Sequence, residues 1–449
     1  MTDVKDSAPL VLGTEKIGKL LMQYAIPAII AMTASSLYNM VDSIFIGHGV
    51  GPLAIAGLAI TFPLMNLAAA FGSLVGVGAS TLVAIKLGQR DKESANQVLG
   101  NVVLMNAIIG LVFMTVALVF LDPILLFFGA SPDTLPYARE YMEVILAGNL
   151  ITHIYMGLNE VLRASGYPRK AMTATLMAVI VNCVLDALFI LVFEWGIRGA
   201  ALATIAAQVI SLSWQLHHFF DKKSFLHFQR GIFGLKRHIV GGMLAIGLSP
   251  FLMNLCACFV VILINKSLKA HGGDLAIGAY GIVNRVVFLF LMIVMGFNQG
   301  MQPIAGYNFG ARQFDRLKQV LKYTVFCGVA VTTIGFLAGQ LFPRPIIYLF
   351  TSDADLTRIA VEGLRIVLIF FPVVGFQMVT SSFFQSIGMA KKAIFLSLTR
   401  QLLFLIPSLL IFPNFFGTVG VWMSMPVADA IATVVAALML RWQLKHLNV

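Results

Sequence analysis

LRASGYPRKA, residues 162–171, returns later in the chain as FQSIGMAKKA, residues 384–393. Gly166 and Gly388 occupy the same place in the two stretches, so the interval is 388 − 166 = 222 residues. A single gapless shift of this kind indicates an internal duplication, in which each half of the chain is one copy of the same fold. The shift also pairs short stretches elsewhere: PLAI at 52–55 with DLAI at 274–277, and QVL at 97–99 with QVL at 319–321.

The composition places both copies in a membrane. Of the 449 residues, 59% are hydrophobic and 11% are charged, whereas soluble domains average about 25% charged residues. Apolar runs of about 20 residues, the length that crosses a hydrocarbon core, recur along the whole chain. They predict twelve transmembrane helices at 20–46, 53–85, 98–120, 137–160, 171–193, 199–217, 243–265, 275–305, 322–342, 359–384, 393–412 and 418–440.

Lysine and arginine follow membrane topology. The chain has 31 of them and a net charge of +11. The tails and alternate loops hold 22, the other loops hold 5, and the spans hold 4. The positive-inside rule therefore predicts that both termini are cytoplasmic, and no nucleic-acid partner is needed to explain the charge. The N-terminus shows no signal peptide with a cleavage site, so we expect the first span itself to direct insertion.

Each half contains six predicted spans, an even number, so both copies enter the membrane in the same orientation. The predicted fold is an all-α membrane protein with twelve transmembrane helices in two six-helix bundles, related by a pseudo-twofold axis along the membrane normal. We predict an N-terminal lobe over 1–217, a cytoplasmic linker over 218–242 and a C-terminal lobe over 243–449. The linker is either an interfacial amphipathic segment or a plain charged connection.

An acid interrupts the apolar stretch VIVNCVLDALFILV, residues 179–192. A carboxylate at the centre of a bilayer costs at least ~2.5 kcal/mol, and such residues usually face a bundle interior or a water-filled cavity. Asn182 and Asp186 are four residues apart, so both side chains lie on one helix face and can present oxygen atoms to one small volume.

Five sequence features stand out along the chain: Pro27, YNMVDSIFIG at 38–47, NCVLD at 182–186, GAALATIAAQ at 199–208 and GFNQGMQPIAGYNFGA at 296–311. Together they resemble the Multidrug And Toxic compound Extrusion (MATE) family over the whole chain, and the last motif is similar to a bacterial multidrug branch. The resemblance implies two six-helix lobes around a central cavity that opens alternately to each side. It also implies export of cationic or amphiphilic compounds across the inner membrane of a bacterium, driven by inward flow of sodium ions or protons.

The same resemblance implies a cation site in the N-terminal lobe, formed by Asp42, Asn182, Asp186 and Thr204. Oxygen ligands of this kind suit sodium, a hard cation. Two neighbouring carboxylates in a low dielectric repel each other, so either a sodium ion or a proton can discharge the pair. We expect the ion to bias the first helix, kinked at Pro27, between two packings.

Other residues are weaker candidates for substrate contact or for support of the site. Tyr38 and Asn39 precede Asp42 by one helical turn, and Met65, Met292, Met295 and Met301 could form an adaptable apolar wall. Arg285, Arg400 and Asp429 interrupt C-terminal spans, where we expect charge pairing. Packing is the default interpretation for His153 and for the methionines.

Two other functions compete with that of an ion-driven antiporter. A lipid-linked oligosaccharide flippase of the same superfamily would favour a cavity rich in Arg and Lys, yet only Arg285 and Arg400 lie near mid-depth. A membrane enzyme would need clustered nucleophile, base or metal groups, which the sequence does not offer. No Walker A motif is present, so ATP hydrolysis is not expected. We therefore predict no enzyme activity and no cofactor besides Na+ or H+ as coupling ion, with amphiphilic cationic drugs as substrates and a monomer as a sufficient assembly.

Overall fold

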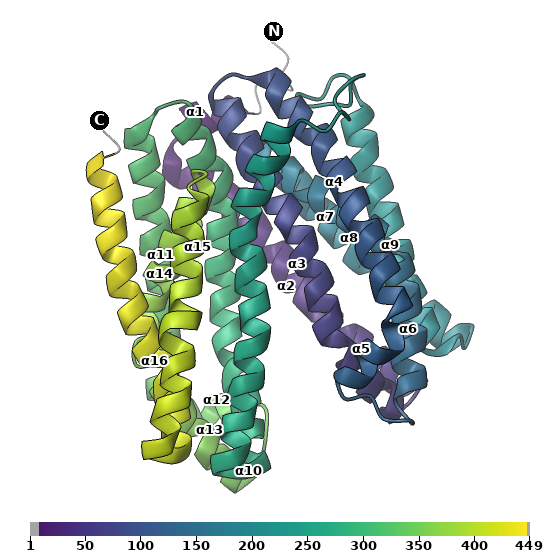
Figure 1. Cartoon of the computed structure of the whole chain (residues 1–449), viewed down its shortest axis with the longest axis vertical. Helices are drawn as coiled ribbons and strands as arrows, with labels where there is room; N and C mark the ends of the chain where they lie inside the picture. The colour runs from purple at the N-terminus through teal and green to yellow at the C-terminus, as the bar shows by residue number, and fades with distance from the viewer. Residues whose placement is uncertain (1–8, 447–449) are drawn as a thin grey trace. The chain divides into compact units, whose positions relative to one another are not determined.

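The computed structural model describes residues 9–446, apart from the side chains of Met40 and Asp274. Within that part of the chain every regular element is a helix, as the sequence predicts, and no strand forms. Figure 1 shows these helices as long rods. Helices satisfy their backbone N–H and C=O groups internally, which is what a hydrocarbon environment requires.

The first half of the chain follows the predicted spans, and its helices extend past most of the apolar runs. Its elements are α1 (Val11–Thr14), α2 (Ile17–Gly49), α3 (Pro52–Gly88), α4 (Lys92–Val119), α5 (Leu121–Phe127), α6 (Leu135–Ala147), α7 (Asn149–Ala164), α8 (Pro168–Asp186), the π-helix η1 (Ala187–Val192) and α9 (Gly196–Phe220).

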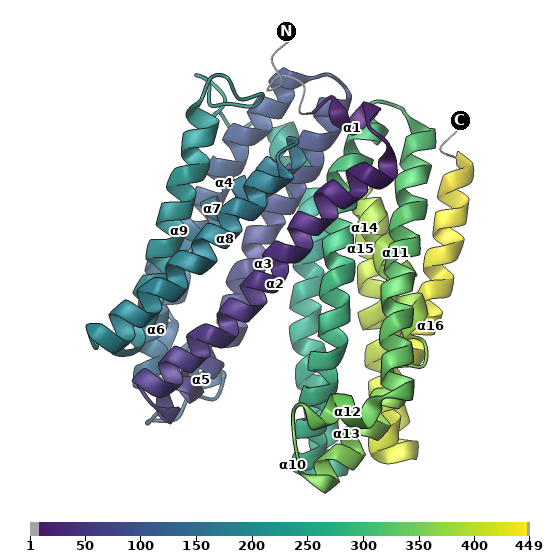
Figure 2. The same ribbon diagram turned by 180° about the vertical axis from the view of Figure 1, so that it is seen from behind.

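The second half repeats this order. Its elements are α10 (Arg237–Gly310), which is interrupted at Gly273, α11 (Phe314–Leu341), α12 (Pro343–Tyr348), α13 (Ala354–Val367), α14 (Phe371–Ser386), α15 (Ala390–Leu398), the π-helix η2 (Thr399–Leu405) and α16 (Ile406–His446). In Figure 2, α8 lies beside α9 and α11 lies beside α14.

The number of spans agrees with the prediction once broken helices are considered. Nine helices in the described residues are long and apolar enough to cross a membrane, and the bent pair α13 and α14 makes ten. The stretch Ala390–His446 contains two rods, because the φ of 58° at Gly417 breaks α16. α6 and α7, which are 13 and 16 residues long, join at Gly148 and together form the remaining span, the predicted 137–160. These divisions give twelve.

The internal repeat is as clear in the backbone as in the sequence. α4 and α11 begin and end 222 residues apart, and so do α7 and α14. Left-handed residues recur at the same interval: Arg90 with Arg312, whose φ values are 61° and 57°, and Gly166 with Gly388. Arg90 precedes Asp91, which caps α4 by accepting a bond of 3.0 Å from the Ser94 N–H. The hydrogen bonds from Ser94 hold the pKa of Asp91 below its usual range.

The described chain divides into two compact units that do not simply follow the halves. The first contains Ile30–Phe251 together with the segment before residue 16, and the second contains Lys16–Ile29 together with the chain from Leu252 onward. The beginning of α2 therefore packs in the second unit, and the beginning of α10 packs in the first. Pro27 and Pro250 lie within three residues of the two crossing points.

Glycines allow these exchanged segments to pack closely. A Cβ atom at Gly247 of α10 would lie 1.7 Å from the carbonyl oxygen of Leu74 in α3. In the second unit, a Cβ atom at Gly300 would lie 2.7 Å from the backbone nitrogen of Ala25 in α2. Ala25 and Gly247 are themselves 222 residues apart, so both units use the same packing.

The linker between α9 and α10 contains turns and no helix, and side chains of α4 hold it. The Asn101 amide donates to the carbonyl oxygens of Ile232 and Gly234 at 3.3 and 3.1 Å, and its oxygen accepts from the Lys236 N–H at 3.2 Å. The Asn96 oxygen accepts from the His227 N–H at 3.2 Å. These hydrogen bonds attach the linker to α4 in the first unit.

Candidate functional site

The four residues assigned to the cation site lie together in the first unit. Asp42 comes from α2, Asn182 and Asp186 come from α8, and Thr204 comes from α9. Asp186 is fully buried, and Asp42 is 4% exposed. The two carboxyl groups lie close enough to interact electrostatically. Two helices that are far apart in sequence, α2 and α8, therefore place two acids in one small volume.

Asn182 connects the acids to α9. Oriented by its hydrogen bonds, its amide nitrogen donates to Asp186 Oδ2 at 2.9 Å and its oxygen accepts from the Thr204 N–H at 2.9 Å. The Thr204 hydroxyl donates to the carbonyl oxygen of Ala200 at 3.1 Å, within its own helix. The Tyr38 hydroxyl, 3.0 Å from Thr204 Oγ1, then serves as the donor of that pair.

Two carboxylate oxygens in this cluster lack a partner. Asp42 Oδ1 and Asp186 Oδ1 are buried and accept no hydrogen bond from the described residues. A buried carboxylate oxygen without a donor carries its full desolvation cost. The arrangement therefore fits a ligand that supplies positive charge, such as a proton or a small hard cation with oxygen ligands.

The backbone changes character at Asp186. α8 ends at this residue, and the chain continues as η1, a π-helix over Ala187–Val192. π-helical segments are rare and frequently mark functional sites. Here the transition directly follows the more deeply buried of the two acids.

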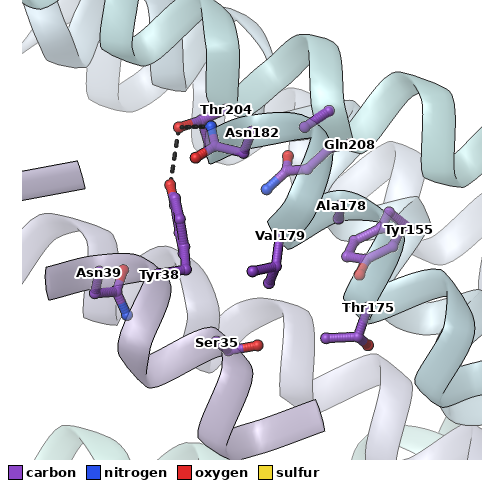
Figure 3. Close-up of a pocket in the computed structure, with 11 residues that line it drawn as sticks. Ser35, Tyr38, Asn39, Tyr155, Thr175, Ala178, Val179, Asn182, Thr204 and Gln208 are labelled. Atoms are coloured by element: carbon purple, nitrogen blue, oxygen red, sulfur yellow. Dashed lines mark hydrogen bonds between the residues drawn. The ribbon is translucent and has the colours of Figure 1, made fainter. Parts of the chain in front are cut away.

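A cavity of 160 Å³ opens beside the cluster, and Figure 3 shows its lining side chains. Tyr38, Asn39, Asn182 and Thr204, all singled out in the sequence, line this cavity. Ser35, Tyr155, Thr175 and Gln208 also line it and were missed. Their spacing could have revealed several of them, because Gln208 follows Thr204 by four residues and Ser35 precedes Tyr38 by three, which puts each pair on one helix face.

A second cavity of 310 Å³ continues from the first. Ser35, Tyr155, Thr175 and Gln208 line both cavities. The second cavity reaches Asn159 and Glu160 in α7, and Glu160 pairs with Arg163 at 3.2 Å. Polar side chains thus extend from the Asp42 and Asp186 cluster along the interior of the first unit.

Tyr141 of α6 is a further residue that the sequence did not reveal. It is 1% exposed, and its phenol lies near Tyr38, Asp42, Asp186 and Thr204. Nothing in the pattern of α6 distinguishes it from an ordinary core tyrosine. Only the folded arrangement of α2, α6, α8 and α9 places it at the site.

The remaining candidates lie elsewhere. Met65 packs against the apolar core of the first unit and lines neither cavity. His153 is buried, with Nε2 3.0 Å from the carbonyl oxygen of Ala68, in agreement with a packing role. Four candidates belong to the second unit: Arg285 is exposed, Met292 and Met301 are buried, and Met295 is partly buried.

Comparisons with known proteins agree with this fold. The chain is 27% identical over 443 residues to the multidrug export protein MepA of Staphylococcus aureus strain MSSA476, covering 97% of this chain and 96% of that protein. A MATE structure in the bent conformation superposes with a TM-score of 0.93 at 26% identity, covering 98% of each chain.

A second solved structure belongs to a MOP superfamily transporter from Pyrococcus furiosus, described as having a binding pocket of reverse polarity that suggests a different function. It superposes with a TM-score of 0.92 at 26% identity and covers 100% of both chains. The MatE family profile matches residues 27–188 and 246–410, which include both halves of the repeat. The chain therefore belongs to the MatE family.

Proposed function

We propose that this protein is a secondary active multidrug antiporter of the bacterial inner membrane. It exports amphiphilic organic cations by alternating access, in exchange for Na+ or H+. The observation that carries the proposal is the buried pair Asp42 and Asp186, with one unpartnered oxygen on each carboxyl group. The export activity named for MepA, a relative that covers almost the whole chain, supports it further.

The geometry supports a role for one mobile positive charge at this pair. When a sodium ion or a proton is bound, the repulsion between the two carboxylates falls, and α2 can approach α8. When the ion leaves, the repulsion favours a packing in which Asp42 moves away. Substrate and ion then drive opposite transitions if each favours a different packing.

α2 is suited to transmit this change because it belongs to both units. Asp42 lies in the part that packs in the first unit, whereas Lys16–Ile29 packs in the second. Pro27 lacks the N–H that would continue the helical bond pattern, so the helix bends most easily near the crossing point. Pro27 is therefore assigned as the hinge.

The character of the cavities favours an organic cation over a lipid-linked pyrophosphate. None of the residues lining the two cavities of the first unit is Lys or Arg, and one of them, Glu160, is acidic. A flippase for a pyrophosphate-linked sugar needs fixed positive charge to stabilise its substrate. Tyr155 and Met156 supply apolar surface that suits an aromatic cation.

The proposal is tested with purified protein in liposomes that contain ethidium as a fluorescent organic cation. A sodium gradient and a pH gradient are imposed separately, and dye movement is followed in time. Movement driven by one gradient supports the antiporter and identifies its coupling ion. Absence of movement under both gradients, together with turnover of a lipid-linked oligosaccharide, would reject the antiporter in favour of the flippase.

A further inference from the structure

An ion pair lies inside the apolar spans of the second unit. Arg400 of η2 donates from Nε to Asp429 Oδ1 of α16 at 2.5 Å. Asp429 is 6% exposed, whereas the Arg400 side chain keeps 31% of its surface accessible. A carboxylate buried this deeply requires a positive partner, because an uncompensated charge in such a place is strongly destabilising.

The internal repeat identifies the counterpart of Arg400 in the first unit. α8 begins at Pro168 and α15 begins at Ala390, which is the 222-residue shift found elsewhere. At this shift Arg400 corresponds to Ala178, and Gln401 corresponds to Val179.

The counterpart of Asp429 is found by aligning α9 with the part of α16 that follows Gly417. Here the shift is 221 residues, since Gly196 and Gly417, with φ values of 63° and 58°, both begin these rods. Asp429 therefore corresponds to Gln208. The buried residues agree with this register: Gly199, Ala200, Ala203, Ala207, Ser211 and Phe219 correspond to Gly420, Val421, Ser424, Ala428, Ala432 and Leu440, which are also buried.

All three counterparts line the 160 Å³ cavity of the first unit. Ala178, Val179 and Gln208 border the open space beside Asn182 and Thr204. The second unit places a guanidinium, an amide and a carboxylate at the equivalent positions. Gln401 is 8% exposed, and its Oε1 accepts no hydrogen bond from any described residue. The two units thus use the same place differently, one with space for a mobile ligand and the other with charged and polar groups.

We infer that Asp429 is a cation-binding position that the protein fills with its own Arg400 guanidinium, so that only the first unit accepts a mobile cation. A tethered group competes at a high effective concentration and loses little freedom on binding, so a free cation cannot displace it. The site should accept a free ligand once Arg400 is removed. The ligand class is a planar cation with several N–H donors, because Asp429 accepts its hydrogen bond from a guanidinium group in the wild type.

Arg400→Ala tests this inference because it removes the tethered cation and leaves Asp429 in place. In detergent, this variant should melt at a lower temperature than the wild type. Millimolar guanidinium chloride should then raise its melting temperature saturably, by about 2 °C or more. The reference is the same concentration of tetramethylammonium chloride, which has no N–H donor. The wild type should show no such difference between the two salts.

The matched control is the neutral pair Arg400→Gln with Asp429→Asn, which keeps the shape and removes both charges. It should not respond to guanidinium. An absent guanidinium effect in Arg400→Ala, or an equal effect in the neutral pair, would overturn the inference. If Arg400→Ala does not survive purification, the monodisperse fraction extracted with and without guanidinium is compared instead, and equal fractions count against it. Neither measurement depends on transport, so the proposed function is tested separately.

Discussion

Asp42 and Asp186 each keep one buried oxygen without a partner, although Asn182, Thr204 and Tyr38 satisfy the atoms around them. Donors are available nearby, yet they bind to one another and to Asp186 Oδ2 instead. Full satisfaction of the acids would hold the site in one state. Because one oxygen of each acid lacks a hydrogen-bond donor, both of these oxygens remain available to bind a mobile cation.

At the residue scale, Asp186→Asn should abolish dye export driven by the coupling gradient while membrane insertion and melting temperature are retained. The amide has almost the same volume but carries no negative charge for the ion to neutralise. Gradient-driven dye transport in liposomes is the measurement, and Asp42→Asn should behave in the same way.

Asp91→Asn is the control for that exchange, because Asp91 caps α4 at an exposed turn and asparagine caps a helix equally well. It should export at the wild-type rate. Gradient-driven export by Asp186→Asn at the wild-type rate would exclude the pair as the coupling site.

Among the helices, α2 and α10 are distinguished by their passage from one compact unit to the other. Each carries a proline within three residues of the crossing point, Pro27 in α2 and Pro250 in α10. A kink at such a point lets the two parts of a helix follow different units without breaking the helix.

Pro27→Ala should slow export strongly and leave the melting temperature unchanged or higher, since alanine restores a helical hydrogen bond and stiffens α2. Binding of the coupling ion, followed by tryptophan fluorescence in detergent, should persist. Pro63→Ala is the comparison, because Pro63 interrupts α3 entirely within the first unit. Equal loss in both variants would mean that any proline in a span matters and that Pro27 is not a special hinge.

Gly247→Ala should destabilise the protein, because the added Cβ would lie 1.7 Å from the Leu74 carbonyl oxygen and must push α10 away from α3. Overpacking of this kind costs about 1–3 kcal/mol, which corresponds to a lower melting temperature of several degrees. Gly241→Ala, on the same helix, meets nothing within 4 Å and should leave the melting temperature unchanged or slightly raised. Similar melting temperatures for the two variants would contradict the close packing of α10 on α3.

For the whole molecule, the exchanged segments make each half of the chain incomplete without the other. Lys16–Ile29 belongs to the first half of the sequence but packs in the second unit, and the beginning of α10 does the reverse. The two copies therefore depend on each other to fold.

A chain divided between Arg230 and Gly231 tests this dependence. Both residues are exposed in the linker, so the break itself should be tolerated. Expressed alone, each half should be recovered only as aggregated or degraded protein, whereas co-expressed halves should copurify and export ethidium. Recovery of either half alone as stable, monodisperse protein would show that the exchange is dispensable for folding.

Much of this protein follows from its sequence alone. Apolar run lengths determine the spans, because every helix must cross a layer of fixed thickness, and the 222-residue shift determines that they form two equivalent sets. The spacing of Asn182 and Asp186 already indicates a shared helix face, since helical geometry is local. The role of these residues as a coupling site stays a prediction that the experiments above address.

Other features were decided only by tertiary structure. The approach of Tyr141 to the acids, the cavity lining by Tyr155 and Thr175, and the unpartnered oxygens all depend on which helices become neighbours. The exchange of Lys16–Ile29 between units is equally invisible in a linear pattern, because both parts of α2 are similarly apolar. Hydrophobic burial in a membrane determines that a helix inserts but not which helix it meets, and that choice is made by close packing at small residues such as Gly247 and Gly300.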